Sequence, residues 1–212
     1  MSWVVAIDGP GGSGKSTVSR ELARRLGVAH LDTGAFYRAA THVVLTAGVD
    51  PSDPVGVLAA VAAAEFDQID GRTFVDGHDV EEGIRGQAVT SAVSEVSAYP
   101  DVRIHMVREQ RRWVAANGGS AVVEGRDIGT VVFPDAILKV FLEADPVERA
   151  RRRALESGMA AEAVQRDLER RDAHDSMRSA SPLTMAEDAA PIDTTSMSVD
   201  EVVEAIVGLL ED

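Results

Sequence analysis

A glycine-rich stretch near the amino terminus restricts the possible folds of this chain more than any other feature. Its residues, Gly9-Pro10-Gly11-Gly12-Ser13-Gly14-Lys15-Ser16, match the pattern G-x-x-x-x-G-K-[ST]. A short apolar run over residues 3–7 precedes the stretch, and apolar residues at helical spacing follow it up to Leu26. Gly27 then favours a helix end, and a second apolar run lies near residues 28–31. The order strand, glycine loop, helix, strand predicts a βαβ unit and a parallel sheet.

The chemistry expected of this loop is the binding of nucleotide phosphates. Glycines let backbone N–H groups turn inward around a phosphate, and the following helix directs its positive end at the same anion. Lys15 is expected to reach the β- and γ-phosphates, and the Ser16 hydroxyl to ligate Mg²⁺. The alternative, a glycine turn that only caps a helix, is disfavoured because a predicted strand precedes the motif and a predicted helix follows it. Lys139 is the only other lysine of the chain, and a lysine at position 15 suits a phosphate cradle too tight for the planar fork of arginine. The expected ATP-binding residues are Gly9, Pro10, Gly11, Gly12, Ser13, Gly14, Lys15, Ser16 and Thr17.

The charge of the chain limits its partners. Over 212 residues it carries 35 acidic and 21 basic side chains, a formal net charge of −14, which argues against nonspecific binding to nucleic acid or to anionic membranes. No apolar run is long enough to cross a membrane, no signal peptide is visible and cysteine is absent, so we expect a cytoplasmic protein. Residues 51–100 and 179–212 hold 17 of the acids and only two bases, so the cations concentrate elsewhere.

Composition predicts a single domain with a core over 1–50 and 100–212 and an insert over about 51–99. The insert has few core-sized residues; we expect helices over 55–64 and 87–98 and a small hairpin over 66–80, around Asp70-Gly71 and Asp76-Gly77. In the core we expect a basic helix over 102–116, strands at 121–123 and 137–142, an arginine-rich helical stretch from 145 to about 175 and a helix over 198–210.

A phosphate-binding loop alone leaves the reaction open. A GTPase switch, an ATPase and a kinase for a small acceptor all use this loop. The guanine-reading motif N-K-x-D cannot be present, because Asn117 is the only asparagine and a glycine follows it. Motor ATPases usually need a longer chain. A small kinase needs an acceptor site, and three further stretches offer one.

These stretches are Leu31-Asp32-Thr33-Gly34-Ala35-Phe36-Tyr37-Arg38, Glu124-Gly125-Arg126-Asp127-Ile128-Gly129-Thr130, and Arg171-Asp172-Ala173-His174-Asp175-Ser176-Met177-Arg178. Together with the glycine loop they closely resemble the bacterial cytidylate kinases, a branch of the nucleoside monophosphate kinase family. The resemblance covers nearly the whole chain. It implies an α/β P-loop kinase fold, with a central parallel sheet flanked by helices, an inserted acceptor-binding subdomain and a helical lid over about 149–178. It also implies Mg²⁺-assisted transfer of the γ-phosphoryl group of ATP to CMP or dCMP.

The resemblance implies a set of residues that bind the acceptor nucleotide. These are Thr33, Tyr37, Arg38, Ser94, Arg103, Arg126, Asp127, Arg171, Asp175 and Arg178. By its chemistry Arg38 suits the phosphate of CMP, because a guanidinium fork matches phosphate oxygens. Tyr37 packs either on the nucleotide or in the core. Ser94, Arg103 and Asp127 are the implied readers of cytosine, whose amino group suits a carboxylate acceptor.

The same resemblance implies the catalytic residues Lys15, Arg126, Arg171 and Arg178. The two lid arginines would supply charge to the transferring group, and Asp175 would orient them. Glu124 closes an apolar run and is the nearest candidate to orient the water shell of Mg²⁺. Asp32 is another carboxylate close to the expected metal position, and Asp8 is expected to stabilise the glycine loop. The histidines receive no role. A kinase for a different small acceptor and a non-catalytic nucleotide-binding regulator remain alternatives. We expect a monomer, because no coiled-coil seam is visible.

Overall fold

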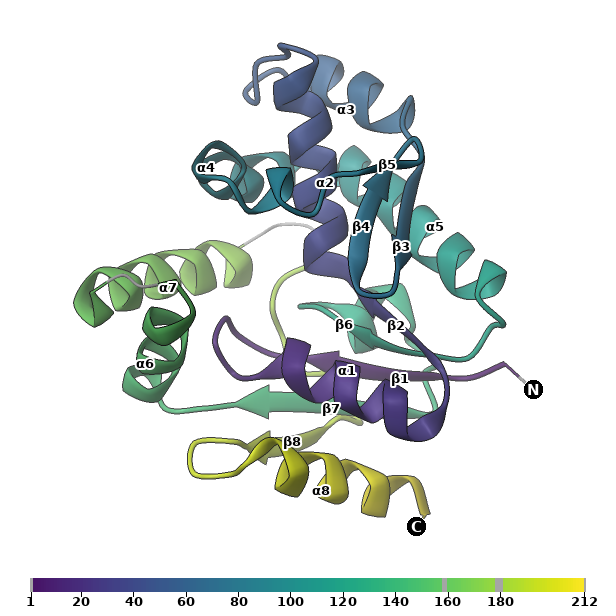
Figure 1. Ribbon diagram of the computed structural model, residues 1–212, viewed down its shortest axis with the longest axis vertical. Coiled ribbons are helices and arrows are strands. Elements are labelled where there is room, and N and C mark those ends of the chain that lie inside the picture. The colour runs from purple at the N-terminus through teal and green to yellow at the C-terminus, as the bar shows by residue number, and fades with distance from the viewer. Residues whose placement is uncertain (1, 158–159, 178–180, 212) are drawn as a thin grey trace. The chain divides into compact units, whose positions relative to one another are not determined.

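The computed structural model describes residues 2–157, 160–177 and 181–211, and these form two compact units (Figure 1). The first unit joins the amino-terminal segment, up to His30, to the carboxyl-terminal part from Asn117 onward. The second unit spans Leu31–Ala116. This unit is wider than the insert expected over 51–99, because the helices on either side of that segment pack with it rather than with the sheet.

The first unit is built on a five-stranded parallel sheet in the order β2-β6-β1-β7-β8. Its strands are β1 Val4–Asp8, β2 Ala29–Asp32, β6 Ala121–Glu124, β7 Leu138–Glu143 and β8 Ala190–Asp193. The register pairs Ile7 with Glu124 and Asp8 with Phe141, so β1, β6 and β7 end at the same edge. Open parallel sheets bind ligands at the carboxyl ends of their strands, which here include the end of β1 before the glycine loop.

Two helices cover one face of this sheet, α1 Lys15–Leu26 and α8 Val199–Glu211. Val5, Ile7 and Leu142 point into the core that the sheet forms with Leu22 of α1 and Ile206 of α8. The other face is also covered, since Ala6 and Val123 are fully buried and the π-helical turn η2, Ile128–Val132, packs against β1. The expectation of a central parallel sheet flanked by helices is therefore confirmed.

Three helices of the first unit follow β7 and β8. Helices α6 Pro146–Ser157 and α7 Ala161–Ser176 pack against each other over the region expected to form the lid. At the start of α8, Ser198 and Glu201 exchange hydrogen bonds with each other's backbone N–H groups, which satisfies two donors of the first turn. Of the helices in the described residues, none combines the length and the apolar character needed to cross a membrane.

The second unit is organised around α2, Thr33–Thr46, whose first turn is capped by the Asp32 carboxylate at 3.0 Å from the Ala35 nitrogen. Around α2 pack α3 Pro54–Ala62, η1 Gly83–Arg85, α4 Gln87–Val96 and α5 Pro100–Ala116. Phe36 of α2 and Phe66 are both buried, and their ring centroids lie 6.1 Å apart. This unit therefore has a core of its own.

A small antiparallel sheet completes the second unit. It consists of β3 Phe66–Ile69, β4 Arg72–Val75 and β5 His78–Asp79. Asp70-Gly71 and Asp76-Gly77 connect the strands, and all four residues have positive φ angles, between 50° and 76°. Such angles at both central residues are typical of the tight turns favoured in hairpins. The expected hairpin is thus present and is extended by a third, short strand.

Candidate nucleotide-binding site

The glycine loop connects β1 to α1 in a conformation that few side chains would allow. Gly9 has a φ of 145°, and a Cβ atom there would clash with the backbone of Leu142. Gly12 has a φ of 77°, and its Cβ would lie 2.8 Å from the carbonyl oxygen of Arg149. The loop therefore needs glycine at these positions for both its own conformation and its packing.

Two charged residues flank the loop. The ammonium of Lys15 donates to the carbonyl oxygen of Pro10 at 2.7 Å, so its charge lies across the loop. Removal from water and the neighbouring Arg126 lower the pKa of Lys15 to about 7. Asp8 is buried and accepts from the backbone nitrogens of Ile128 and Gly129, and burial raises its pKa to about 6. Asp8 thus anchors the segment after β6 rather than the loop itself.

Ser16 and Glu124 form the oxygen-rich side of the site. Ser16 is exposed, and its hydroxyl lies 2.8 Å from Oε2 of the buried Glu124. Burial by itself raises the pKa of Glu124, but His30, Lys15 and the Ser16 hydroxyl together hold it below its usual range. A hydroxyl beside an ionised carboxylate supplies the hard oxygen ligands that Mg²⁺ prefers, so these residues fit the cation that accompanies ATP. Within the described residues, no cluster of three or more acidic or histidine side chains forms a separate metal site.

Arg126 lies between the glycine loop and α7. Its guanidinium donates to the carbonyl oxygen of Gly9 at 2.6 Å and lies 3.1 Å from the carboxylate of Asp175. The structure therefore brings together two of the expected site residues, Arg126 and Asp175. A second carboxylate of α7, Asp172, accepts from the Gly11 backbone nitrogen at 3.2 Å and pairs with Arg149. Carboxylates of α7 thus contact both a loop N–H and two arginines.

The other arginines expected in the lid have different environments. Arg149 is buried and donates to the carbonyl oxygen of Gly11 at 2.9 Å. Arg151 and Arg152 both pair with Glu148, and these pairs lower the pKa of Glu148 to about 2. Of the two arginines expected to be catalytic in the lid, Arg171 belongs to α7 but its side chain is not described, and Arg178 lies outside the described residues.

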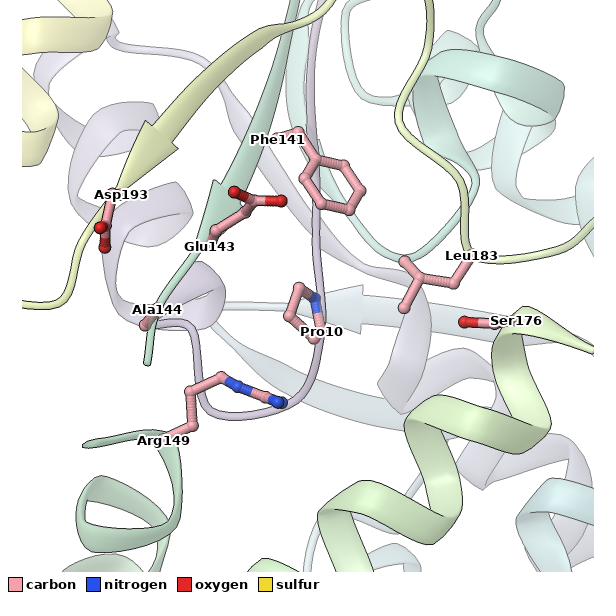
Figure 2. Close-up of a pocket in the computed structure, with 8 residues that line it drawn as sticks. All are labelled: Pro10, Phe141, Glu143, Ala144, Arg149, Ser176, Leu183 and Asp193. Atoms are coloured by element: carbon pink, nitrogen blue, oxygen red, sulfur yellow. The ribbon is translucent and has the colours of Figure 1, made fainter. Parts of the chain in front are cut away.

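A cavity of about 400 Å³ opens beside the loop, at the carboxyl ends of β7 and β8 (Figure 2). Its walls include Pro10 of the loop, Phe141 and Glu143 of β7, and Arg149. In Figure 2 the side chains of Phe141 and Arg149 lie on opposite sides of Pro10. Thr194, which follows β8, is buried below the loop with its hydroxyl 3.0 Å from the carbonyl of Ser13. Its side chain therefore supports the loop.

The second unit contains half of the residues expected to bind the acceptor. Thr33, Tyr37 and Arg38 lie on the first two turns of α2, and Thr33 is buried. The Arg38 guanidinium donates to the Thr90 hydroxyl of α4 at 3.0 Å and to the carbonyl oxygen of Ile84 at 3.4 Å. Arg38 is therefore held between two elements of its own unit. Asp32, considered as a metal carboxylate, instead caps α2.

The expected cytosine readers are divided between the units. Arg103 of α5 is buried, donates to the carbonyl oxygen of Ser97 at 3.2 Å, and places its guanidinium 5.0 Å from the centre of the Tyr37 ring. Ser94 is half-buried on α4. Asp127 belongs to the first unit, where it is buried at the start of η2. The buried ring of Tyr37 therefore positions Arg103 by a cation–π contact.

Three residues near these groups were missed by reasoning from the sequence. His30 contacts Glu124, Asp172 contacts the loop, and Thr90 contacts Arg38. Asp172 lies in one of the quoted stretches and carries an obvious charge. His30 and Thr90 give no such signal, because each becomes relevant only through the pairing of elements that are distant in the sequence.

The fold and the loop define the class of this protein. A parallel sheet carrying a phosphate-binding loop, with Lys15 and Ser16 at the start of α1 and arginines around it, is the arrangement of a P-loop kinase. The shikimate kinase of Acinetobacter baumannii has the same fold, with a TM-score of 0.50 at 15% identity over 99% of this chain and 93% of that one.

Sequence comparison identifies the family within this class. The family described as Cytidylate kinase matches residues 5–212. The cytidylate kinase of Mycobacterium leprae is 49% identical over 98% of this chain and 95% of that protein, and the cytidylate kinase of Mycolicibacterium paratuberculosis is 50% identical over 98% and 94%. The chain belongs to the cytidylate kinase family.

Proposed function

We propose that this protein transfers the γ-phosphoryl group of ATP to CMP and dCMP, forming ADP and CDP or dCDP. The observation that carries the proposal is the complete phosphate-binding loop, in which Lys15 bonds to Pro10 and Ser16 to Glu124, in a chain that a cytidylate kinase matches over 98% of its length. The phosphate of CMP is itself a competent nucleophile near neutral pH, so the reaction needs no general base. Catalysis then depends on positioning and electrostatic stabilisation.

On the donor side, the loop residues 9–17 bind the phosphates of ATP. Lys15 contacts the β- and γ-phosphates, and the Ser16 hydroxyl ligates Mg²⁺, with Glu124 orienting bound water. Mg²⁺, when bound, neutralises charge on the phosphates. Several hydrogen-bonding groups suited to a phosphate lie at the loop, where they now bind carboxylates. The Gly11 N–H and Arg149 bind Asp172, and Arg126 binds Asp175.

On the acceptor side, Arg38 and Arg126 bind the phosphate of CMP. Thr33, Tyr37 and the lid residues Arg171, Asp175 and Arg178 complete the binding of the nucleotide and of the transferring group. Arg38 is fixed by α4 and η1 in the second unit, and Arg126 by the loop in the first. Guanidinium groups fixed in this way lose little conformational entropy when they bind a phosphate.

Ser94, Arg103 and Asp127 read the base. The carboxylate of Asp127 accepts from the amino group of cytosine, whereas uracil presents an oxygen acceptor at that position. A buried polar group left without its partner costs roughly 1–3 kcal/mol, so this contact favours CMP over UMP about ten- to a hundredfold. The burial of Asp127 and Arg103 supports this role, because a buried polar group is sensitive to a mismatched partner.

A coupled assay of ADP formation tests the proposal, with CMP, dCMP, UMP, AMP and GMP each offered in turn. We expect the largest kcat/KM with CMP and dCMP, and a loss of the CMP-over-UMP preference in Asp127→Asn. If another monophosphate is preferred, the acceptor assignment is wrong, and if none gives ADP, the protein is not such a kinase. We further propose that the protein acts as a monomer in the cytoplasm; light scattering of the purified chain tests the first part.

A further inference from the structure

His30 contacts the phosphate-binding site, although no step of the proposed reaction uses it. It belongs to β2 in the first unit, and its side chain is only 12% exposed. The Nε2 atom lies 3.2 Å from Oε1 of Glu124 and 3.0 Å from the hydroxyl oxygen of Ser19. A single ring nitrogen of His30 therefore connects α1 to the carboxylate at the end of β6.

Each oxygen of the Glu124 carboxylate has a different side chain beside it. Oε2 lies 2.8 Å from the Ser16 hydroxyl, and Oε1 faces His30. The carboxylate is 3% exposed, and an ionised carboxylate only accepts hydrogen bonds. Both contacts must therefore be donated to it, by the Ser16 hydroxyl and by an N–H on Nε2 of His30. The Ser19 hydroxyl shares the same N–H as a second acceptor and directs its own proton towards the carbonyl oxygen of Ser16, at 3.5 Å.

This division has a consequence for Ser16. A hydroxyl that ligates a cation does so through its oxygen lone pairs. In this structure the hydroxyl proton of Ser16 points to Glu124, so the lone pairs are directed away from the carboxylate. The orientation of the hydroxyl therefore depends on the orientation of the carboxylate. Ser16 contacts Oε2 of Glu124, and the contact of His30 with Oε1 opposes rotation of the carboxylate about that bond.

We propose that His30 is a positioning residue that, by holding Glu124, orients the Ser16 hydroxyl for the Mg²⁺ bound with the donor nucleotide. The inference rests on the proposed use of Mg·ATP, but not on the identity of the acceptor. Its chemistry is that of outer-shell partners in metal sites, which orient the ligands without touching the metal.

Binding of ADP to the purified full chain tests this role without any catalytic turnover. Calorimetry measures the Kd of ADP with excess Mg²⁺ and again with EDTA. The Kd with EDTA divided by the Kd with Mg²⁺ reports how much the cation strengthens binding. In His30→Phe, which keeps a ring and loses the N–H, we expect this ratio to shrink about tenfold, with the metal-free Kd nearly unchanged. In His30→Gln, whose amide can donate from a similar position, we expect most of the ratio to return.

Two further variants make the result specific. His105→Leu replaces another half-buried histidine, on α5 of the second unit, and should leave the ratio unchanged. His30→Asn is polar but too short to reach Glu124, so it should behave like His30→Phe and serves if that variant does not fold.

An unchanged ratio in His30→Phe and His30→Asn would overturn the proposal, and so would an equal weakening of ADP binding with and without Mg²⁺. A wild-type protein that binds Mg·ADP normally but forms no CDP would instead contradict the proposed function.

Discussion

The two units hold their functional cations with different kinds of partner. In the first unit, Arg126 and Arg149 pair with the carboxylates of Asp175 and Asp172 on α7. In the second unit, the contacts of Arg38 include the Thr90 hydroxyl and a backbone carbonyl, and those of Arg103 include a backbone carbonyl and the ring of Tyr37. Acids of α7 therefore pair with the two arginines beside the loop, while a hydroxyl, backbone carbonyls and an aromatic ring help to position Arg38 and Arg103.

This difference predicts that different contacts contribute to the free energy of phosphate binding at the glycine loop and at Arg38. A phosphate that enters the glycine loop competes with the Asp172 carboxylate for the Gly11 N–H and for Arg149. Charged hydrogen bonds are stronger than neutral ones, so this exchange costs part of the binding energy. The Thr90 hydroxyl can keep its contact with Arg38 while a phosphate binds, because a guanidinium has further N–H groups to donate. We expect substitutions to affect nucleotide binding in the first unit through charge and in the second through geometry.

Removal of the loop ammonium should have the largest effect. In Lys15→Ala, the β- and γ-phosphates lose their half-buried positive partner, and we expect kcat to fall about 10²- to 10³-fold. Steady-state assays with saturating CMP measure this. Lys139→Met is the matched control, since Lys139 is the only other lysine and its ammonium pairs with Asp188 at 2.8 Å. That variant should retain kcat within about twofold. Near-normal turnover of Lys15→Ala would exclude the proposed use of the loop.

The pH dependence of donor binding should be steep, because Lys15 is not fully charged in the free protein. The pKa of Lys15 in the free protein is about 7, and a bound phosphate stabilises the charged ammonium. Above pH 7 the complex therefore holds more protons than the free protein and free ADP together. Binding of ADP should therefore take up a proton, and affinity should fall as pH rises from 7 to 9, by up to about tenfold per unit.

Calorimetry in buffers of different ionisation enthalpy measures this proton uptake. Lys15→Arg, whose guanidinium stays charged, should bind ADP without taking up a proton above pH 7. Proton uptake of the same size in both proteins would assign the pH dependence to another group.

Neutralising the carboxylate that contacts the loop should strengthen donor binding. Asp172→Asn keeps the shape of the side chain and removes its charge, so ADP should bind about three- to tenfold more tightly. A competition assay with a fluorescent ADP analogue measures the change. Weaker binding would show that Asp172 supports the loop instead of competing with phosphate, and would remove the contrast between the two units.

The smallest effect is expected in the second unit. Thr90→Val removes the hydroxyl that Arg38 contacts and keeps the side-chain volume, so the KM for CMP should rise about threefold while kcat changes little. Thr90→Ser should restore the wild-type KM. A fall in kcat with an unchanged KM would indicate that Arg38 acts on the transferring group and not on acceptor binding.

Much of the fold could be predicted from local sequence patterns. The strands around 121–123 and 137–142, the helix after the loop and the turns at Asp70-Gly71 and Asp76-Gly77 are present close to the expected positions. These features depend on residues a few positions apart, whose spacing determines local backbone geometry. The bounds of the second unit could not be predicted from such local patterns. Whether α2 and α5 pack with the sheet or with residues 51–99 depends on the apolar faces of several helices together.

The candidate site was predictable to a similar degree. The glycine loop and the expected arginines follow from motifs, but the partners of those arginines do not. Tyr37 illustrates this limit, because its ring was open to a role in either nucleotide binding or the core, and the structure places it under Arg103. The side chain of Arg171 and the whole of Arg178 lie outside the described residues, so their roles remain predictions.

The sequence by itself determined the phosphate-binding loop, the family and the types of side chain available for the chemistry, because each depends on short, contiguous patterns. The tertiary structure decided which of these side chains meet. The order β2-β6-β1-β7-β8 brings His30 to Glu124, and the packing of α7 brings Asp172 to Gly11. These partners are separated by 94 and 161 residues along the chain, and only the pairing of strands and helices in space brings them within hydrogen-bonding distance.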